Sequence, residues 1–396
     1  MQRYLIQFNY FGSRFQGLQK QLFRRKIAGM TEAEVQTMYE KDEGTIQGAL
    51  ESAVWNIVKP SNPVKLVTSS RTDKGVHALL NTAHVDLHPS TATGKYFPPA
   101  EITKMVNLWM IKKDLDIRVR KTMAVPPTFH SRINVARRSY LYRMAVVPEA
   151  IDAGTNTWTE LPFKNVHRRS RANEYNRCIL SKLALNERGR YWEFNLKDGE
   201  VFDLELFKET LKLMEGVHDF TNFCNPTSHF HCIYVDGKRN TKVRKTVAEM
   251  TKEVFRTEVF HQHSPLPDSL YPAYGESGIK FIDILIEGKS FLHNQVRRMI
   301  GAASSVATNK ISIDYVRNIL EVPYISWDYK IHVGNSSGLY LANIEYKEGV
   351  LDLATDNYQD MLNLEKISVS DTEVISMDVF NNDETSFYNA LSEETS

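Results

Sequence analysis

The order of strand and helix patterns in the first third of the sequence constrains the fold more than any other feature. Residues 3–10 alternate between two faces, as in a half-buried strand. Thr45 is a suitable N-cap for a helix over 46–58, whose apolar residues share one face. Further patterns predict strands at 64–69, 80–87 and 115–123 and a helix from 98 to 112. The order β-α-β-β-α-β predicts an antiparallel sheet with two helices on one face, the ferredoxin-like plan.

A second half begins after Pro126-Pro127 and repeats an α+β plan with longer connections. We therefore predict an α+β chain with an N-terminal subdomain at 1–123, a C-terminal subdomain at 124–346 and an acidic tail at 347–396. The second half has strand patterns at 132–143, 243–260, 279–287 and 339–346, and helix patterns at 204–215, 289–307 and 313–320. The segment 22–43 has the character of an insertion, and 148–200 gives no clear pattern.

Composition narrows the class of protein. The hydrophobic share of 42% and the charged share of 24% are ordinary for a globular chain. No apolar run is long enough for a membrane span, and the N-terminus has no clear presequence. Three cysteines indicate no disulfide framework, so a reducing compartment is expected. Because the tail is rich in Asp and Glu, the body before it is net basic, which suits a polyanionic partner.

The stretch 67–80 is the first candidate for chemistry. A strand pattern ends in two serines, and Arg71 and Asp73 then stand two residues apart, followed by Gly75. One interpretation is a hairpin loop in which Asp and Gly serve the turn itself. The other is a carboxylate held beside a guanidinium, ready to act on a substrate. His77, just after the loop, fits a packed, hydrogen-bonded structural histidine.

Three other stretches are candidates. Residues 137–143 interleave arginines with Tyr140 and Tyr142, which fits either cross-strand packing or contact with phosphates and unstacked bases. In the helix pattern after Phe291, Arg297 lies beside the apolar face and needs a carboxylate partner, for which Asp73 is a candidate. The Cys and His residues at 224–232 lack the spacing of a structural zinc site, so an ordinary loop is favoured there. A phosphate-binding loop and a dinucleotide fingerprint are absent from the sequence.

The stretch Ser70-Arg71-Thr72-Asp73-Lys74-Gly75-Val76-His77-Ala78 resembles the G-R-T-D-x-G-V-H-A signature of the TruA family of tRNA pseudouridine synthases, with Ser70 in place of the usual Gly. Other stretches resemble the family's segments in the same order: Gly12 to Gly17, Thr45 to Glu51, Phe129-His130-Ser131-Arg132 with Tyr140-x-Tyr142, His218 to Phe223, Phe291 to Gly301 and Gly338 to Leu341. Within this family, the sequence most resembles the animal tRNA pseudouridine synthase-like branch.

This resemblance implies two ferredoxin-like or RNA-recognition-like subdomains, whose mostly antiparallel sheets join around a central basic cleft. It implies conversion of uridine to pseudouridine in tRNA, in the anticodon-stem region by family analogy, without cofactor or metal. Asp73 would be the catalytic nucleophile. Asp73 would act either by covalent addition to the nucleoside or by abstraction of a ribose proton, and the sequence does not distinguish these two routes. The resemblance also implies a homodimer in mitochondria or cytoplasm, with no role at a membrane.

Roles for the arginines and the tyrosine follow from the same resemblance. Tyr140, Arg71 and Arg297 would bind the substrate, Tyr140 at the flipped base and Arg297 as the counter-charge of Asp73. Weaker candidates for contact with RNA are Arg132, Arg137, Arg138 and Arg298. The alternative is a catalytically silent RNA-binding or chaperone protein with the same fold. A plain RNA-recognition module is disfavoured, because the sequence lacks the aromatic strand motif of that module.

Overall fold

The structure is a computed structural model of the 396-residue chain. It describes residues 1–20, 42–148, 187, 189–197, 199–225, 229–235, 238–262, 279–325, 327 and 331–364. Most of the predicted insertion 22–43, the middle of 148–200 and the tail beyond 364 therefore lie outside the described residues.

The N-terminal third has the predicted plan. Its elements are β1 (Gln2–Tyr10), α3 (Ile46–Val58), β2 (Val67–Thr68), β3 (His77–Leu87), α4 (Pro99–Lys112) and β4 (Ile117–Val125). The strands lie in the order β4-β1-β3-β2, and every pair is antiparallel. Thr45 caps α3 as predicted, since its hydroxyl oxygen accepts a hydrogen bond from the Gly48 N–H.

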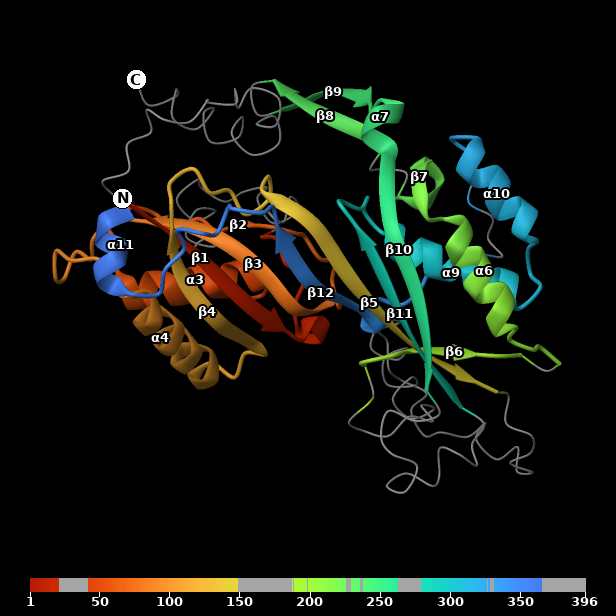
Figure 1. The fold of residues 1–396 in the computed structure, drawn as a ribbon, viewed down its shortest axis with the longest axis horizontal. Coiled ribbons are helices and arrows are strands. Elements are labelled where there is room, and N and C mark those ends of the chain that lie inside the picture. Colours follow the sequence, from red (N-terminus) through yellow and green to blue (C-terminus); the bar gives the residue numbers. More distant parts are fainter. Residues whose placement is uncertain are drawn as a thin grey trace.

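The second half adds longer strands and a second group of helices (Figure 1). Its strands are β5 (Val135–Val147), β6 (Trp192–Asn195), β7 (Gly216–Asp219), β8 (Phe230–Val235), β9 (Lys238–Arg244), β10 (Thr251–Gln262), β11 (Lys280–Gly288) and β12 (Leu339–Tyr346). Its helices are α6 (Leu204–Leu213), α7 (Val247–Met250), α9 (Gln295–Ala307), α10 (Ile313–Glu321) and α11 (Tyr358–Leu364), with short 3-10 turns that include Thr221–Phe223 and Ser336–Gly338.

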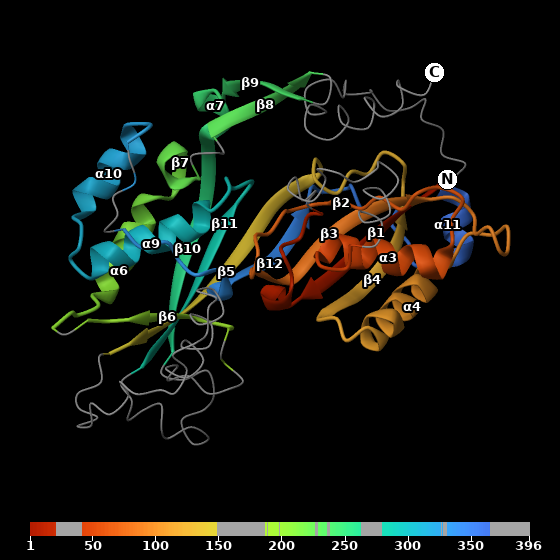
Figure 2. The same ribbon diagram turned by 180° about the vertical axis from the view of Figure 1, so that it is seen from behind.

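The two halves share one open sheet. Its order is β4-β1-β3-β12-β5-β11-β10-β7, with β2 added to β3 and β6 to β5, so it has ten strands. β12 joins the halves, because it pairs in parallel with β3 and antiparallel with β5. Figures 1 and 2 show α3 and α4 beside the N-terminal strands, and α6, α9 and α10 beside the C-terminal ones. The fold is α+β as predicted, with a mostly antiparallel sheet; the domain limits at 123 and 346 stay predictions.

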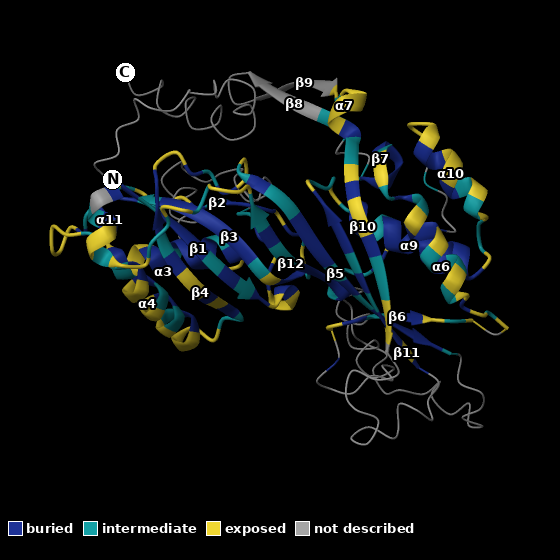
Figure 3. Ribbon diagram, viewed as in Figure 1, coloured by how far each residue is buried: buried dark blue, intermediate teal, exposed yellow. Residues whose placement is uncertain are grey.

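The strand alternation in β1 is confirmed by burial. Tyr4, Ile6 and Phe8 belong to the main core under the helices, while Leu5 packs on the opposite face with Val125 and Phe129. In Figure 3 the strands are mostly buried, and the outer faces of the helices are exposed. Within the described residues, no helix is both long and apolar enough to cross a membrane.

Two predicted elements were wrong in extent. The pattern at 243–260 is not one strand: β9 ends at Arg244, and the helical turn α7 separates it from β10. The reason is a capping box, in which Thr246 and Glu249 bond each other's backbone N–H groups. The helix predicted from 289 begins only at Gln295, because Asn294 has a left-handed backbone with φ of 64°.

The first part of the acidic tail returns to the N-terminal half. Thr355 forms a bridge with Ala124 of β4, and α11 lies against the same strand. Val350 and Leu351 cover the small core around Leu5 on the sheet face opposite α3. Residues 350–354 therefore cover one face of the sheet, whereas Met361 and Leu364 of α11 belong to the main core on the other face.

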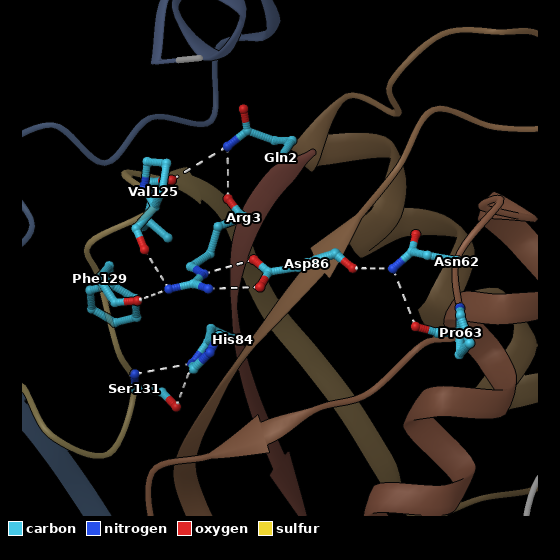
Figure 4. A network of polar contacts seen from close by, with 10 residues as sticks. Gln2, Arg3, Asn62, Pro63, His84, Asp86, Val125, Phe129 and Ser131 are labelled. Atoms are coloured by element: carbon cyan, nitrogen blue, oxygen red, sulfur yellow. Dashed lines mark hydrogen bonds and ion pairs between the residues drawn. The ribbon is translucent and has the colours of Figure 1, made fainter. Parts of the chain in front are cut away.

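A polar network fixes the chain where it passes from β4 to β5 (Figure 4). The Arg3 guanidinium forms two bonds of 2.7 Å with the Asp86 carboxylate and a third of 2.7 Å with the Phe129 carbonyl. The Ser131 N–H donates to Nδ1 of the buried His84 over 3.1 Å, so this nitrogen is unprotonated. Burial lowers the pKa of His84 to about 3, which makes the network dependent on a neutral imidazole.

We expect stability to fall with acid because of His84. The pKa of His84 is lowered in the folded state, so below pH 6.5 this histidine binds a proton in the unfolded chain but not in the folded chain. Between pH 7.5 and pH 5 this removes about 2 kcal/mol from the free energy of unfolding. In His84→Asn the amide can replace Nδ1 but does not titrate. Urea unfolding at several pH values should give a flatter profile for this variant, and equal slopes for both proteins would contradict the assignment.

Candidate active site

The loop between β2 and β3 carries Asp73, and its shape is set by Gly75. Gly75 has φ of +81°, a left-handed conformation that side chains other than Gly rarely adopt. A Cβ there would also lie 2.7 Å from the Ser336 hydroxyl. The Val76 N–H donates to the Asp73 carbonyl over 3.1 Å and closes the turn. The predicted hairpin and its glycine are therefore confirmed.

The N-terminal segment supports this loop from one side. The Tyr10 hydroxyl lies 2.7 Å from the Thr72 hydroxyl, and the Leu18 N–H donates to the Thr72 carbonyl over 3.0 Å. Gly12 touches the loop so closely that a Cβ would meet the Val76 carbonyl oxygen at 1.9 Å. Burial raises the pKa of Tyr10, so it remains a neutral phenol.

Asn81 and Arg138 hold the start of the loop. The fully buried Asn81 accepts a bond from the Ser69 hydroxyl over 2.9 Å and donates to the Ser70 carbonyl over 3.2 Å. The Arg138 guanidinium donates to the Ser69 carbonyl over 2.7 Å and also to the Lys289 carbonyl. Arg138 is buried and thereby links the Asp73 loop to the segment that leads into α9.

An imidazole and a guanidinium meet the Asp73 carboxylate. His293 Nε2 lies 3.0 Å from Asp73 Oδ1, and Arg297 Nη1 lies 3.9 Å from Oδ2. The side chains are 45% exposed for His293, 33% for Asp73 and 20% for Arg297, so the three run from solvent into the protein. Asp73 and Arg297 are together as predicted, although they are 224 positions apart in the sequence.

The N-terminal end of α9 fixes Arg297. Its Nε donates to the Gly334 carbonyl over 2.7 Å, and its Nη1 donates to Asn294 Oδ1 over 2.9 Å. The left-handed conformation of Asn294 places its side chain for this bond. The Gln295 side chain accepts from the Leu292 N–H over 2.8 Å, so the turn before the helix is also closed. The Arg297 guanidinium is therefore held in place by groups other than Asp73.

Tyr140 lies beside the loop, deep in the protein. It is on β5 and 7% exposed, and its hydroxyl is 2.9 Å from the Ser70 hydroxyl. The Phe291 ring meets it edge to face at 5.2 Å between centroids. Burial raises the pKa of Tyr140, and the negative charge of Asp73 contributes in the same direction. Tyr140 is thus a neutral phenol close to Asp73.

The other predicted site residues are more dispersed. Arg71 is exposed on the Asp73 loop, and the exposed Arg132 donates from Nε to the Thr68 carbonyl over 3.3 Å. Arg137 forms ion pairs with Glu345 at 2.6 Å and with Glu287 at 3.5 Å. The Arg298 guanidinium lies 4.5 Å from the centre of the Trp327 ring and donates to the Asn222 carbonyl. Arg71 and Arg132 are thus the two on the surface near the loop.

His77 packs inside the protein, as expected. Its Nδ1 accepts from the Gly12 N–H over 3.1 Å, its Nε2 lies 3.1 Å from the Gly189 carbonyl, and its ring stacks on Tyr340. Burial lowers the pKa of His77 to about 4.

The residues that sequence reasoning missed are His293, Tyr10 and Asn81. His293 stands four positions before Arg297, in the turn that leads into the helix of Arg297. This spacing was a signal that the two side chains could lie close together. Tyr10 and Asn81 gave no signal, since a buried polar side chain on a strand looks like any other strand residue.

The described residues contain no group of three or more His, Cys, Asp and Glu that could hold a metal ion. Cys224 is buried, and its thiol contacts the Thr221 carbonyl at 3.4 Å. His229 Nε2 lies 3.0 Å from the same carbonyl. The loop expected at 224–232 is wrong in extent, because β8 begins at Phe230.

The candidate site therefore consists of a carboxylate loop on an α+β sheet, an arginine from a helix and a buried tyrosine from a strand. Residues 211–347 match the family model described as tRNA pseudouridine synthase. The chain is 25% identical to tRNA pseudouridine synthase-like 1 of Xenopus laevis, over 87% of this chain and 91% of the relative. It is 26% identical to the Homo sapiens protein of the same name, over 87% and 90%, and 25% identical to tRNA pseudouridine synthase A 2 of Bacillus cereus, over 87% and 100%.

The chain carries a TruA-type pseudouridine synthase domain. It is therefore an enzyme of the pseudouridine synthase class, isomerases that act on tRNA uridine. The predicted family resemblance and enzyme class are confirmed.

We expect Asn81 to be required for the loop and not only for stability. Asn81→Leu leaves the Ser69 hydroxyl and the Ser70 carbonyl without their partner, which lowers the free energy of unfolding by about 3 kcal/mol. Its activity should fall even at a temperature where the variant is fully folded.

Asn107→Leu is the matched control. Asn107 uses its amide in the same way, with two bonds of 2.8 Å to the Val119 backbone on β4. The control should lose stability and retain turnover. If both variants lose turnover in proportion to stability, Asn81 has no specific effect on the loop.

Proposed function

We propose that this chain converts uridine to pseudouridine in tRNA, with Asp73 as the catalytic nucleophile. The observation that carries the proposal is the placement of the Asp73 carboxylate, one-third exposed on a rigid loop and opposite the fixed Arg297 guanidinium. A nearby positive charge favours the ionised carboxylate, which is the reactive form in this chemistry.

The reaction itself is an internal exchange and needs no outside reactant. The N1–C1′ bond of uridine breaks, a C5–C1′ bond forms, and the proton on C5 is replaced by one on N1. Asp73 either adds to the nucleoside or removes a ribose proton, and both routes begin from the same carboxylate. Neither route requires a metal or a cofactor.

The target uridine must leave its stack, because these three atoms cannot exchange partners inside a duplex. We propose that the Tyr140 ring packs against the flipped base from below the loop. Arg71 would occupy the vacated position or grip the adjacent phosphate, and Arg132 would contact the RNA backbone. A basic cleft, an anticodon-stem target and a homodimer stay predictions from family analogy.

We expect Asp73→Ala to abolish pseudouridine formation and to leave tRNA binding nearly unchanged, since binding depends on many phosphate contacts. Carbodiimide mapping of an unmodified tRNA transcript and filter binding measure the two effects. Asp314→Ala, which removes an exposed carboxylate paired with Arg317 on α10, is the control and should be fully active. Normal turnover by Asp73→Ala would reject the proposed nucleophile. Wild-type protein that binds tRNA and forms no product would favour the silent RNA-binding alternative.

Tyr140→Phe tests whether the hydroxyl acts on the substrate. Because that hydroxyl is bonded to Ser70, we expect Tyr140→Phe and Ser70→Ala each to lower single-turnover rates by about tenfold, the effect of one buried hydrogen bond. The double variant should be no slower than the slower single one, since both remove the same bond. A far larger loss for Tyr140→Phe alone would indicate direct contact between the hydroxyl and the base.

A further inference from the structure

The Asp73 carboxylate is approached from two sides by cationic groups of different kinds. Arg297 is held by the Gly334 carbonyl and the Asn294 side chain and is 20% exposed. His293 stands on the turn before α9 and is 45% exposed. The arginine is therefore the more buried and fixed partner of Asp73, and the histidine is the more exposed one.

We propose that His293 is a positioning residue that caps Asp73 in the substrate-free enzyme and is displaced by the incoming nucleoside. This inference rests on the proposed role of Asp73. The distance of 3.0 Å between His293 Nε2 and Asp73 Oδ1 is that of a charge-assisted hydrogen bond. A nucleoside that reaches Asp73 from solvent meets the imidazole first, because His293 is the more exposed of the two.

Protonation decides how firmly the cap is closed. The hydrogen bond with Asp73 raises the pKa of His293, burial acts in the opposite direction, and the charges of Arg297 and Arg298 also lower it. Since the net shift is upward, the imidazolium–carboxylate pair is complete at acid pH. The pair is lost as the pH rises through the raised pKa, and the carboxylate then keeps Arg297 as its charged partner.

The cap competes with substrate, so its effect should fall on KM rather than on kcat. When the competent form is a fraction of the enzyme, the apparent dissociation constant rises by the inverse of that fraction. One pH unit below the pKa of the cap corresponds to about a tenfold rise. Because the pKa of His293 is raised above its ordinary value of 6.5, the wild-type KM for an unmodified tRNA transcript should be at least about tenfold higher at pH 5.5 than at pH 8.5.

His293→Ala should lose this difference, with a KM at pH 5.5 close to its value at pH 8.5. His88→Ala is the control: His88 is on the far end of the β3 region, beside the Ser61 hydroxyl, and its removal should leave the wild-type pH dependence of KM. A His293→Ala variant that keeps the wild-type dependence would overturn the inference. So would a variant in which kcat falls and KM retains its pH dependence, because His293 would then act in the chemistry.

A second measurement does not depend on activity. The pKa of His293, followed by the NMR shift of its Cε1 proton, should lie above 6.5 in the wild type and fall in Asp73→Asn. If the pKa of His293 is the same in Asp73→Asn as in the wild type, the pairing is overturned, even if the wild-type enzyme is active. If wild-type protein forms no pseudouridine at any pH, the proposed function fails, and the NMR titration still decides whether His293 caps Asp73.

Discussion

The pairing of β12 with β3 and β5 is the interaction on which the site depends. It sets Tyr340 opposite His77 in a parallel ladder and Leu341 opposite Tyr140 in an antiparallel one. Because the start of β3 directly follows the Asp73 loop, this one strand brings the loop beside β5, which carries Tyr140. The ladder to β11 then places the turn before α9 on the same side, with His293 and Arg297. A carboxylate, a phenol and a guanidinium from distant parts of the sequence thus meet through three strand pairings.

Local patterns predicted most elements, because the residues that decide them are neighbours in the sequence. Thr45 before an amphipathic stretch was enough for α3, and alternation was enough for β1 and β5. The errors arose where a side chain overrode the pattern. A reciprocal Thr246–Glu249 cap interrupted an apparently continuous strand, and the left-handed Asn294 delayed the start of α9.

The site was predictable in part for a similar reason. An arginine beside an apolar helix face needs a carboxylate, so Asp73 was a candidate partner of Arg297 once the loop was recognised. His293 does not require a carboxylate partner in the same way, since a half-exposed histidine can form hydrogen bonds with water. Asn81 could not be found either, because its partners are the Ser69 hydroxyl, the Ser70 carbonyl and the Thr82 N–H, and only the folded loop brings the two serines into range.

The two partners of Asp73 differ in burial and in whether their charge depends on pH. This difference explains how His293 can act as a cap. Arg297 lies on the inner side, and its guanidinium carries a permanent charge. His293 lies on the outer side, and it is the one partner whose charge changes near neutrality. If Arg297 and His293 exchanged places, a permanent charge would lie between the substrate and the Asp73 carboxylate, and a group that titrates would lie behind the carboxylate. The observed order instead leaves Asp73 with a constant counter-charge from within, while access from solvent depends on a group that substrate or a rise in pH can displace.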